Sequence, residues 1–160
     1  MKERTIEQYT ADAETYCARA ERAPLEVISW LTRRGATREQ SRAITEHLKE
    51  SGFIDERRFT AAFACDKLRF DGWGPNKIAY TLRAKGIDEE LISQIIPTVM
   101  ADEDAPAILH ALLLRRIASL PDEEITPDMM GRKVVQWAVN RGFPIDDVLG
   151  TLQKIRSEAD

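Results

Sequence analysis

The chain of 160 residues has the length of a single domain, and it is also long enough for several small units in a row. Hydrophobic residues make up 43% of it and charged residues 31%, which excludes a disordered or collagen-like protein and predicts a folded core. Its 23 basic and 27 acidic side chains give a formal net charge of -4, so no overall positive field draws it to nucleic acid or to an anionic membrane, and any basic surface must be local.

The apolar stretches are too short to cross a membrane. The longest clear run extends from Ala111 to Leu114, whereas a membrane-spanning helix needs roughly 20 residues. The charged start from Met1 to Arg4 is followed by no apolar segment, so we expect no secretory signal peptide and a cytoplasmic location. Two cysteines, Cys17 and Cys65, are too few for a disulfide framework, and their apolar neighbours predict buried free thiols.

Apolar residues recur at three- and four-residue spacing through almost every segment, which predicts an all-α protein. In chain order, the pattern predicts one helix at about residues 5–20, a second that ends before Gly35, and a third that begins near Thr37. The same order returns twice, with first helices at about residues 55–70 and 102–118. The spacing therefore predicts about nine helices in all.

The second helix of each group lies in a segment that resembles its two counterparts. Residues 24–35 align with residues 75–86 and 131–142, and each segment starts with Pro or Gly and closes with a basic residue followed by Gly. Pro or Gly at the start and a basic residue before Gly at the end are typical helix boundaries. Every copy therefore predicts a helix, a tight glycine turn and a second helix.

These copies predict three tandem three-helix repeats, at residues 1–52, 53–100 and 101–160. The extra length of the third repeat falls in the loop at residues 119–127, where repeat proteins accept insertions. Units of about 50 residues are small for independent cores. We therefore expect neighbouring repeats to pack on one another in an elongated array.

Three motifs in the middle repeat resemble the RecX family. They are Gly52 to Phe59, Gly72 to Ile78 and Leu82 to Ile87, which are similar to the family's Gly-Tyr-Leu-Asp-Asp-x-x-Phe-Ala, Gly-x-Gly-Pro-x-x-Ile and Leu-x-x-Lys-Gly-Ile patterns. The first repeat looks like the family at residues 16–24 and 33–35, and the third resembles it more loosely at residues 132–155. The resemblance therefore covers nearly the whole chain.

The resemblance implies a small cytoplasmic bacterial regulator, without catalytic activity, whose helical repeats form a curved array. It further implies binding to the RecA recombinase filament on single-stranded DNA, within the groove of that filament. Inhibition of ATP hydrolysis, strand exchange and co-protease activity would then modulate recombinational DNA repair and the SOS response. This chain is more acidic than many relatives, which argues against independent DNA binding more than against filament binding.

Charge is unevenly distributed, because residues 101–160 hold 7 basic and 11 acidic side chains while the two earlier repeats are balanced. We hypothesise a broken basic stripe that contacts the partner, formed by Arg33, Arg34, Lys77, Arg83, Lys85, Arg132, Lys133 and Arg141. The competing explanation is local. A basic residue just before a C-capping glycine interacts favourably with the helix dipole, by roughly 0.3 to 1 kcal/mol, and this alone accounts for Arg34, Lys85 and Arg141.

Trp73 lies between two glycines in the segment from Asp71 to Pro75, and it has two interpretations. It is either a partner-binding anchor or a large aromatic side chain packed over the junction between neighbouring repeats. Trp30 and Trp137 each lie five residues before the glycine of their turn, and we expect them to seal repeat interfaces.

No residue pattern points to catalysis, a metal or a cofactor. His47 and His110 are far apart in sequence, no Cys-x-x-Cys pair exists, and the glycines at 72 and 74 are followed by Pro75 rather than by a phosphate-binding loop. We therefore expect a binding protein that is not an enzyme. The ends of the repeat array lack a large apolar excess, so we also expect a monomer. One alternative function stays open, a helical module that binds DNA directly, and a plain helical scaffold for some other partner is a third.

Overall fold

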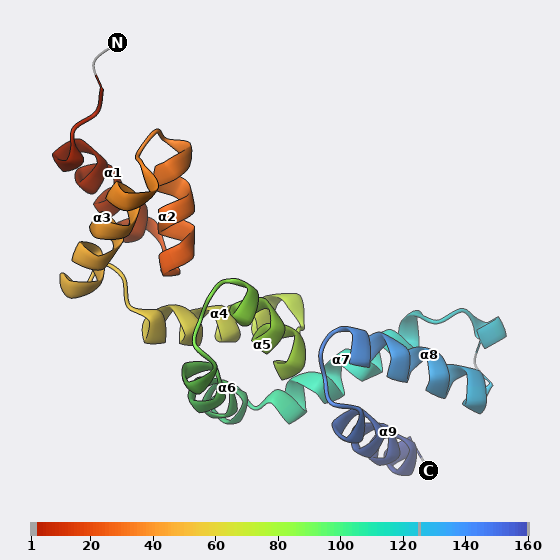
Figure 1. Ribbon diagram of the computed structural model, residues 1–160. Helices are drawn as coiled ribbons and strands as arrows, with labels where there is room; N and C mark the ends of the chain where they lie inside the picture. The colour runs from red at the N-terminus through yellow and green to blue at the C-terminus, as the bar shows by residue number, and fades with distance from the viewer. Residues whose placement is uncertain (1–2, 125, 160) are drawn as a thin grey trace. The chain divides into compact units, whose positions relative to one another are not determined.

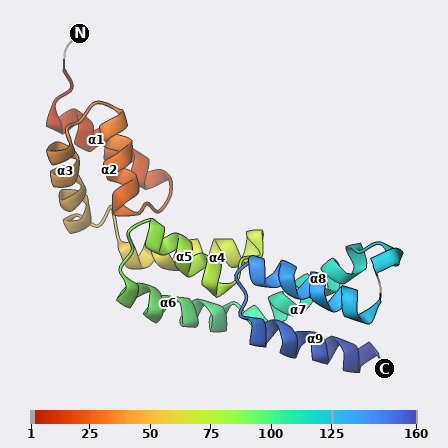
Figure 2. The ribbon, with the colours of Figure 1, turned by 45° about the vertical axis from the view of Figure 1, so that its right-hand side comes forward.

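A computed structural model describes residues 3–124 and 126–159 of the chain (Figures 1 and 2). Across these residues it contains nine α-helices, one short 3-10 helix and no β-strand, so the all-α fold predicted from the apolar spacing is confirmed. The α-helices are α1 (Ile6–Arg19), α2 (Pro24–Arg33), α3 (Arg38–Glu50), α4 (Glu56–Asp71), α5 (Pro75–Ala84), α6 (Glu89–Asp102), α7 (Ala105–Ser119), α8 (Pro127–Asn140) and α9 (Ile145–Ala159), and the 3-10 helix is η1 (Asp122–Glu124).

The helices begin close to the residues that the sequence indicates. Thr5 and Thr37 each accept a hydrogen bond from the backbone N–H three residues later, and Gln8 and Gln40 bond back to the threonine N–H. The predicted start of the seventh helix at residue 102 is wrong by three residues, because α6 continues to Asp102. Side-chain capping thus fixes the starts of α1 and α3.

Three glycine turns end α2, α5 and α8 in the same way. Gly35, Gly86 and Gly142 have φ values of +109°, +83° and +98°, which side chains other than glycine rarely adopt. The residue after each glycine donates its N–H to a carbonyl five residues earlier, at 3.1 Å from Ala36 to Leu31 and at 3.1 and 3.2 Å in the other two turns. The predicted helix, glycine turn, helix arrangement is therefore confirmed in all three copies.

The chain divides into two compact units. The first unit holds Met1–Ala62 with Leu82–Ile92, and α1, α2 and α3 pack on one another within it. The second holds Phe63–Thr81 with Ser93–Asp160, and there α7, α8 and α9 pack on one another (Figure 2). The repeat limits at residues 52 and 100 stay a prediction, and the outermost repeat residues, 1 and 160, lie outside the described residues.

Most apolar residues at three- and four-residue spacing are buried, although Ile6 of α1 and Phe70 of α4 are 52% and 78% exposed. Val27 and Leu31 of α2 are 0% exposed, and the matching residues of α5 and α8 are equally buried. Burial of these side chains removes apolar surface from water and is the main favourable contribution to folding. The predicted core positions found buried are Val27, Leu31, Ile44, Leu48, Ile78, Leu82, Ile92, Ile95, Ile96, Val99, Val134, Ala138, Val148 and Leu152.

Candidate partner-binding surface

The first turn of α5 lies on the glycine turn that follows α8, with backbone against backbone. The N–H of Gly74 donates to the carbonyl oxygen of Arg141 at 2.7 Å, and the N–H of Asn76 donates to that of Gly142 at 2.9 Å. A Cβ at Gly74 would lie 2.5 Å from the backbone of Gly142, and a Cβ at Gly142 would lie 2.5 Å from the backbone nitrogen of Lys77. Gly72 in turn has a φ of +64°. The close approach at Gly74 and the left-handed backbone at Gly72 explain why the segment from Asp71 to Pro75 carries two glycines.

A similar arrangement occurs in the first unit, where the first turn of α2 lies on the glycine turn that follows α5. The side chain of Leu25 covers Gly86 so closely that a Cβ there would lie 2.4 Å from its Cδ1. Beside it, the ammonium group of Lys85 donates to Glu26 at 2.7 Å across 59 residues of sequence. Lys85, a predicted partner-binding residue, is therefore engaged within the chain.

The other two basic residues that precede a turn glycine also have partners within the chain. The guanidinium of Arg34 lies 4.5 Å from the centroid of the Trp30 ring and 3.9 Å from the carboxylate of Asp12. Arg141 donates to the carbonyl oxygens of Asp71 and Gly72, and its guanidinium lies 5.0 Å from the Trp137 ring centroid. Each of these cations thus makes side-chain contacts that the helix dipole alone does not account for.

Trp73 is half-buried beside the joint between α5 and the turn after α8. Its ring meets that of Phe63 edge-on at 6.5 Å, and the ammonium groups of Lys67 and Lys77 lie 4.7 and 4.4 Å from the ring centroid. Lys77, another predicted contact, therefore interacts with an aromatic face. Part of the Trp73 side chain stays accessible, and its role as a partner-binding anchor stays a prediction.

The remaining predicted residues are exposed. Arg33 donates to the carbonyl oxygen of Ser29 in its own helix at 3.3 Å, and Arg83 forms an ion pair with Glu89, with 2.8 Å between Nη2 and Oε1. The hydrogen bond from Arg83 lowers the pKa of Glu89 below its ordinary value. Arg132 and Lys133 lie exposed on α8.

Two neighbouring hollows in the second unit bring some of these cations together with residues that the sequence analysis missed. One, of about 580 Å³, is lined by Arg116, Arg132, Lys133 and Trp137 among others. The other, of about 410 Å³, is also lined by Arg116 and Trp137, together with Arg115, Arg141 and Phe70 among others. Two adjacent arginines, Arg115 and Arg116, interrupt the apolar helix α7, and this break in its pattern was the signal that could have identified them as candidate contacts.

The chemistry of these hollows suits an anionic group. The Nε of Arg116 is buried and has no hydrogen-bond partner among the described residues, and its guanidinium lies 5.6 Å from the Trp137 ring centroid. A planar guanidinium binds carboxylate or phosphate oxygens with parallel N–H donors. Phe70, at the edge of the second hollow, is 78% exposed. We therefore define Arg115, Arg116, Arg132 and Lys133, together with the exposed ring of Phe70, as the basic cluster of the second unit.

The structure also places the remaining groups with chemical potential. Cys17 is buried as predicted, but Cys65 is only half-buried, and its thiol donates to the carboxylate of Glu103 at 3.2 Å. Burial raises the pKa of both thiols, and the hydrogen bonds from Cys65 and Arg69 lower the pKa of Glu103. Within the described ranges, no cluster of three or more His, Cys, Asp or Glu side chains could hold a metal ion, and no helix is long and apolar enough to span a bilayer.

Comparison with known proteins gives one consistent group of relatives. Residues 55–96 match the second three-helix domain of RecX proteins. Regulatory protein RecX of Halorhodospira halophila is 30% identical over 132 residues, which cover 82% of this chain and 78% of that protein. Regulatory protein RecX of Bacillus licheniformis is 28% identical over 141 residues, or 87% of this chain, although the chain spans only about half of that relative's length, 52%.

A solved structure shares the fold. The crystal structure of RecX from Lactobacillus salivarius superposes with a TM-score of 0.80, and the match covers 94% of this chain and 96% of that one. The two sequences are 17% identical in this match, so this likeness concerns the arrangement of the helices alone.

Proposed function

Because this chain belongs to the RecX family, we propose that it is a regulatory protein that binds the RecA recombinase filament on single-stranded DNA. Binding would inhibit ATP hydrolysis, strand exchange and co-protease activity of RecA, and would thereby modulate recombinational DNA repair. The observation that carries the proposal is the 30% identity to a regulatory protein RecX across 78% of that protein's length. The proposal includes a cytoplasmic location and a monomeric state.

The predicted partner-binding residues differ in how well they suit this role. Lys77, Lys85 and Arg141 make contacts that hold the chain together, as described above. Arg33 and Arg132 are exposed, and neither forms an ion pair with a carboxylate among the described residues. An exposed cation at the rim of an interface mainly steers association with an anionic partner surface. We therefore propose Arg33 and Arg132 as the first filament contacts to test.

The test is ATP hydrolysis by RecA on single-stranded DNA at fixed salt, with this protein titrated well below the concentration of DNA sites. We expect suppression at substoichiometric amounts. The double variant Arg33→Glu, Arg132→Glu is expected to need roughly ten times more protein for equal inhibition, which corresponds to about 1.4 kcal/mol of binding free energy. Reversal of Lys85 would be a poorer test, because it places a carboxylate beside Glu26.

The control variant is Arg38→Glu, an exposed arginine at the first position of α3 and outside the predicted stripe. It changes the net charge in the same direction and is expected to inhibit RecA like the unmodified chain. Absence of inhibition even with protein in excess would contradict the RecA proposal. Equal inhibition by the double variant would remove Arg33 and Arg132 from the contact surface.

Direct binding of single-stranded DNA is the second candidate function, and the basic cluster of the second unit favours it. Proteins that bind single strands combine cations that follow the phosphates with an exposed aromatic ring on which a base stacks. Arg115 and Arg116 supply the first of these and Phe70 the second. The net charge of -4 restricts such binding to this local surface.

Fluorescence anisotropy of a labelled single-stranded oligonucleotide, measured without RecA at several salt concentrations, tests this candidate. Each phosphate contact contributes roughly 0.7 to the slope of log affinity against log salt, so Arg115→Gln with Arg116→Gln should lower that slope by about 1 to 1.5. Arg19→Gln, an exposed arginine at the end of α1, is the control and should leave it unchanged. If the double variant and the control bind the oligonucleotide equally weakly, and their binding increases sharply when RecA is added, the result would instead support the filament proposal.

A further inference from the structure

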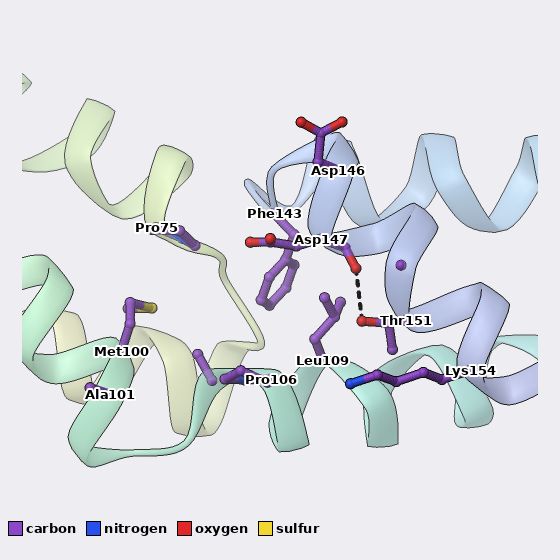
Figure 3. A pocket seen from close by; sticks show the side chains of 12 residues that line it. Pro75, Met100, Ala101, Pro106, Leu109, Phe143, Asp146, Asp147, Thr151 and Lys154 are labelled. Carbon is purple, nitrogen blue, oxygen red and sulfur yellow. Dashed lines mark hydrogen bonds between the residues drawn. The ribbon is translucent and has the colours of Figure 1, made fainter.

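The second unit contains a hollow of about 500 Å³ that is separate from the basic cluster (Figure 3). Its walls come from the start of α5, the end of α6, the start of α7, the turn before α9 and the first ten residues of α9. The side chains of Leu109 and Phe143, which are 3% and 2% exposed, extend into it from α7 and from the turn before α9, and Met100 and Pro106 also line it. The interior is therefore apolar and has the volume of a typical ligand pocket.

The shape of this pocket is set by a sharp break between two helices. Asp104 separates α6 from α7 with a φ of +53°, a left-handed conformation, and its side chain caps α7 by accepting from the N–H of Ala107 at 3.4 Å. The next residues, Ala105 and Pro106, line the pocket. Because this turn and the buried ring of Phe143 belong to the folded structure, the pocket exists before any ligand binds.

Negative charge borders the opening. Asp146 and Asp147 line it from the first turn of α9. Lys154 is the single cation among the lining residues. The hydroxyl of Thr151 donates to the backbone oxygen of Asp147 at 2.7 Å and so is already satisfied within α9 (Figure 3).

Helix dipoles explain part of this charge, since acidic residues are favourable in the first turn of a helix. They do not explain an apolar hollow beneath those acids. An anionic ligand such as nucleic acid would meet like charges at this opening, whereas a cationic ligand would meet opposite ones. The combination of an apolar interior and an acidic rim therefore defines the chemistry of the occupant.

We propose that this pocket docks a basic segment of a partner protein. One large apolar side chain of that segment fills the hollow above Leu109 and Phe143, and lysine or arginine residues on either side of it face Asp146 and Asp147. Buried apolar anchors provide most of the affinity at such sites, and the surrounding charges select the partner. This docking site requires neither RecA nor DNA, so it stands apart from the function proposed above.

The test uses the full chain labelled with ¹⁵N and four capped peptides whose central residues are Lys-Phe-Lys, Gln-Phe-Gln, Glu-Phe-Glu and Lys-Ala-Lys. Two-dimensional NMR follows the backbone amides of Phe143, Gly150 and Thr151, which line the pocket. We expect Lys-Phe-Lys to shift these signals with a dissociation constant on the order of 1 mM, as suits so short a ligand. The other three peptides are expected to bind at least tenfold more weakly.

Gly150 offers a variant that fills the pocket without disturbing the fold. It lies exposed in α9, lines the pocket, and a Cβ there would meet no atom within 4 Å. Gly150→Leu should therefore place a side chain in the opening and weaken Lys-Phe-Lys binding at least tenfold, whereas Gly150→Ala should leave it unchanged. Both variants replace glycine inside a helix with a better helix former, so both should fold.

A second pair of variants tests the rim. Asp146→Asn with Asp147→Asn should remove the preference for Lys-Phe-Lys over Gln-Phe-Gln. The control Asp128→Asn removes a carboxylate from the first turn of α8, outside the pocket, and should preserve that preference. Equal binding of Lys-Phe-Lys and Glu-Phe-Glu, or no effect of Gly150→Leu, would overturn the proposal. If the pocket signals shift with protein concentration in the absence of peptide, a second copy of the chain occupies the pocket, and the proposal would be overturned.

Discussion

Replacement of Gly74 with alanine is expected to destabilise the second unit by about 3 kcal/mol. The added Cβ would lie 2.5 Å from the carbonyl carbon and oxygen of Gly142 and equally close to the nitrogen of Phe143. These are backbone atoms, which cannot rotate away as a side chain can. The joint must therefore open, and the hydrogen bond of 2.7 Å from Gly74 to Arg141 is lost with it. Urea unfolding followed by far-ultraviolet circular dichroism measures the effect.

Gly150→Ala is the matched control for this substitution. Gly150 has a helical backbone and open space around it, so alanine there should raise the stability by about 0.5 to 1 kcal/mol. The two substitutions add the same methyl group and should change stability in opposite directions. A loss below 1 kcal/mol for Gly74→Ala would show that the two backbones do not approach as closely as described.

The second large effect is expected for Leu113→Ala in α7. Leu113 is 0% exposed, so removal of its side chain both loses buried apolar area and leaves a cavity. Substitutions of this kind cost about 2 to 5 kcal/mol, and the cost increases with the volume that the structure cannot refill. The same urea unfolding measurement applies.

Leu114→Ala serves as its control, because Leu114 is the next residue of the same helix and is 45% exposed. The two variants share helix, chemistry and helix propensity, and differ only in burial. We expect less than about 1 kcal/mol for Leu114→Ala. Similar losses for both variants would contradict the assignment of Leu113 to the core.

The helices and their turns could be predicted from the sequence because their causes are local. Apolar spacing of three and four residues identifies the buried face of a helix, and a basic residue followed by glycine identifies its end. Val27 and Leu31 in α2, for example, follow from periodicity alone and are both fully buried. The displaced start of α7 depends on the left-handed conformation of Asp104, which no periodic pattern indicates. The start of α8 is displaced as well, because the helix begins at Pro127, four residues before the Gly131 that opens the aligned segment.

The roles of the basic residues could be predicted less well, because their partners are distant in sequence. Lys85 pairs with Glu26 across 59 residues, and Arg141 reaches the carbonyl oxygens of residues 71 and 72 across about 70. A stripe of cations in the sequence therefore includes residues that hold helix pairs together. Arg115 and Arg116 were missed for the opposite reason, because they belong to a helix whose apolar stripe suggested only a core role.

The backbone joint between α5 and the turn after α8 has a consequence for how such a chain changes in evolution. Its two hydrogen bonds join main-chain atoms, and the close approach of the two backbones requires glycine at positions 74 and 142. A duplicated gene segment that encodes one helix pair carries both halves of such a joint with it, the first turn and the glycine turn. Copy number can therefore grow or shrink by whole helix groups, while the side chains on the outer faces diverge to meet different partners.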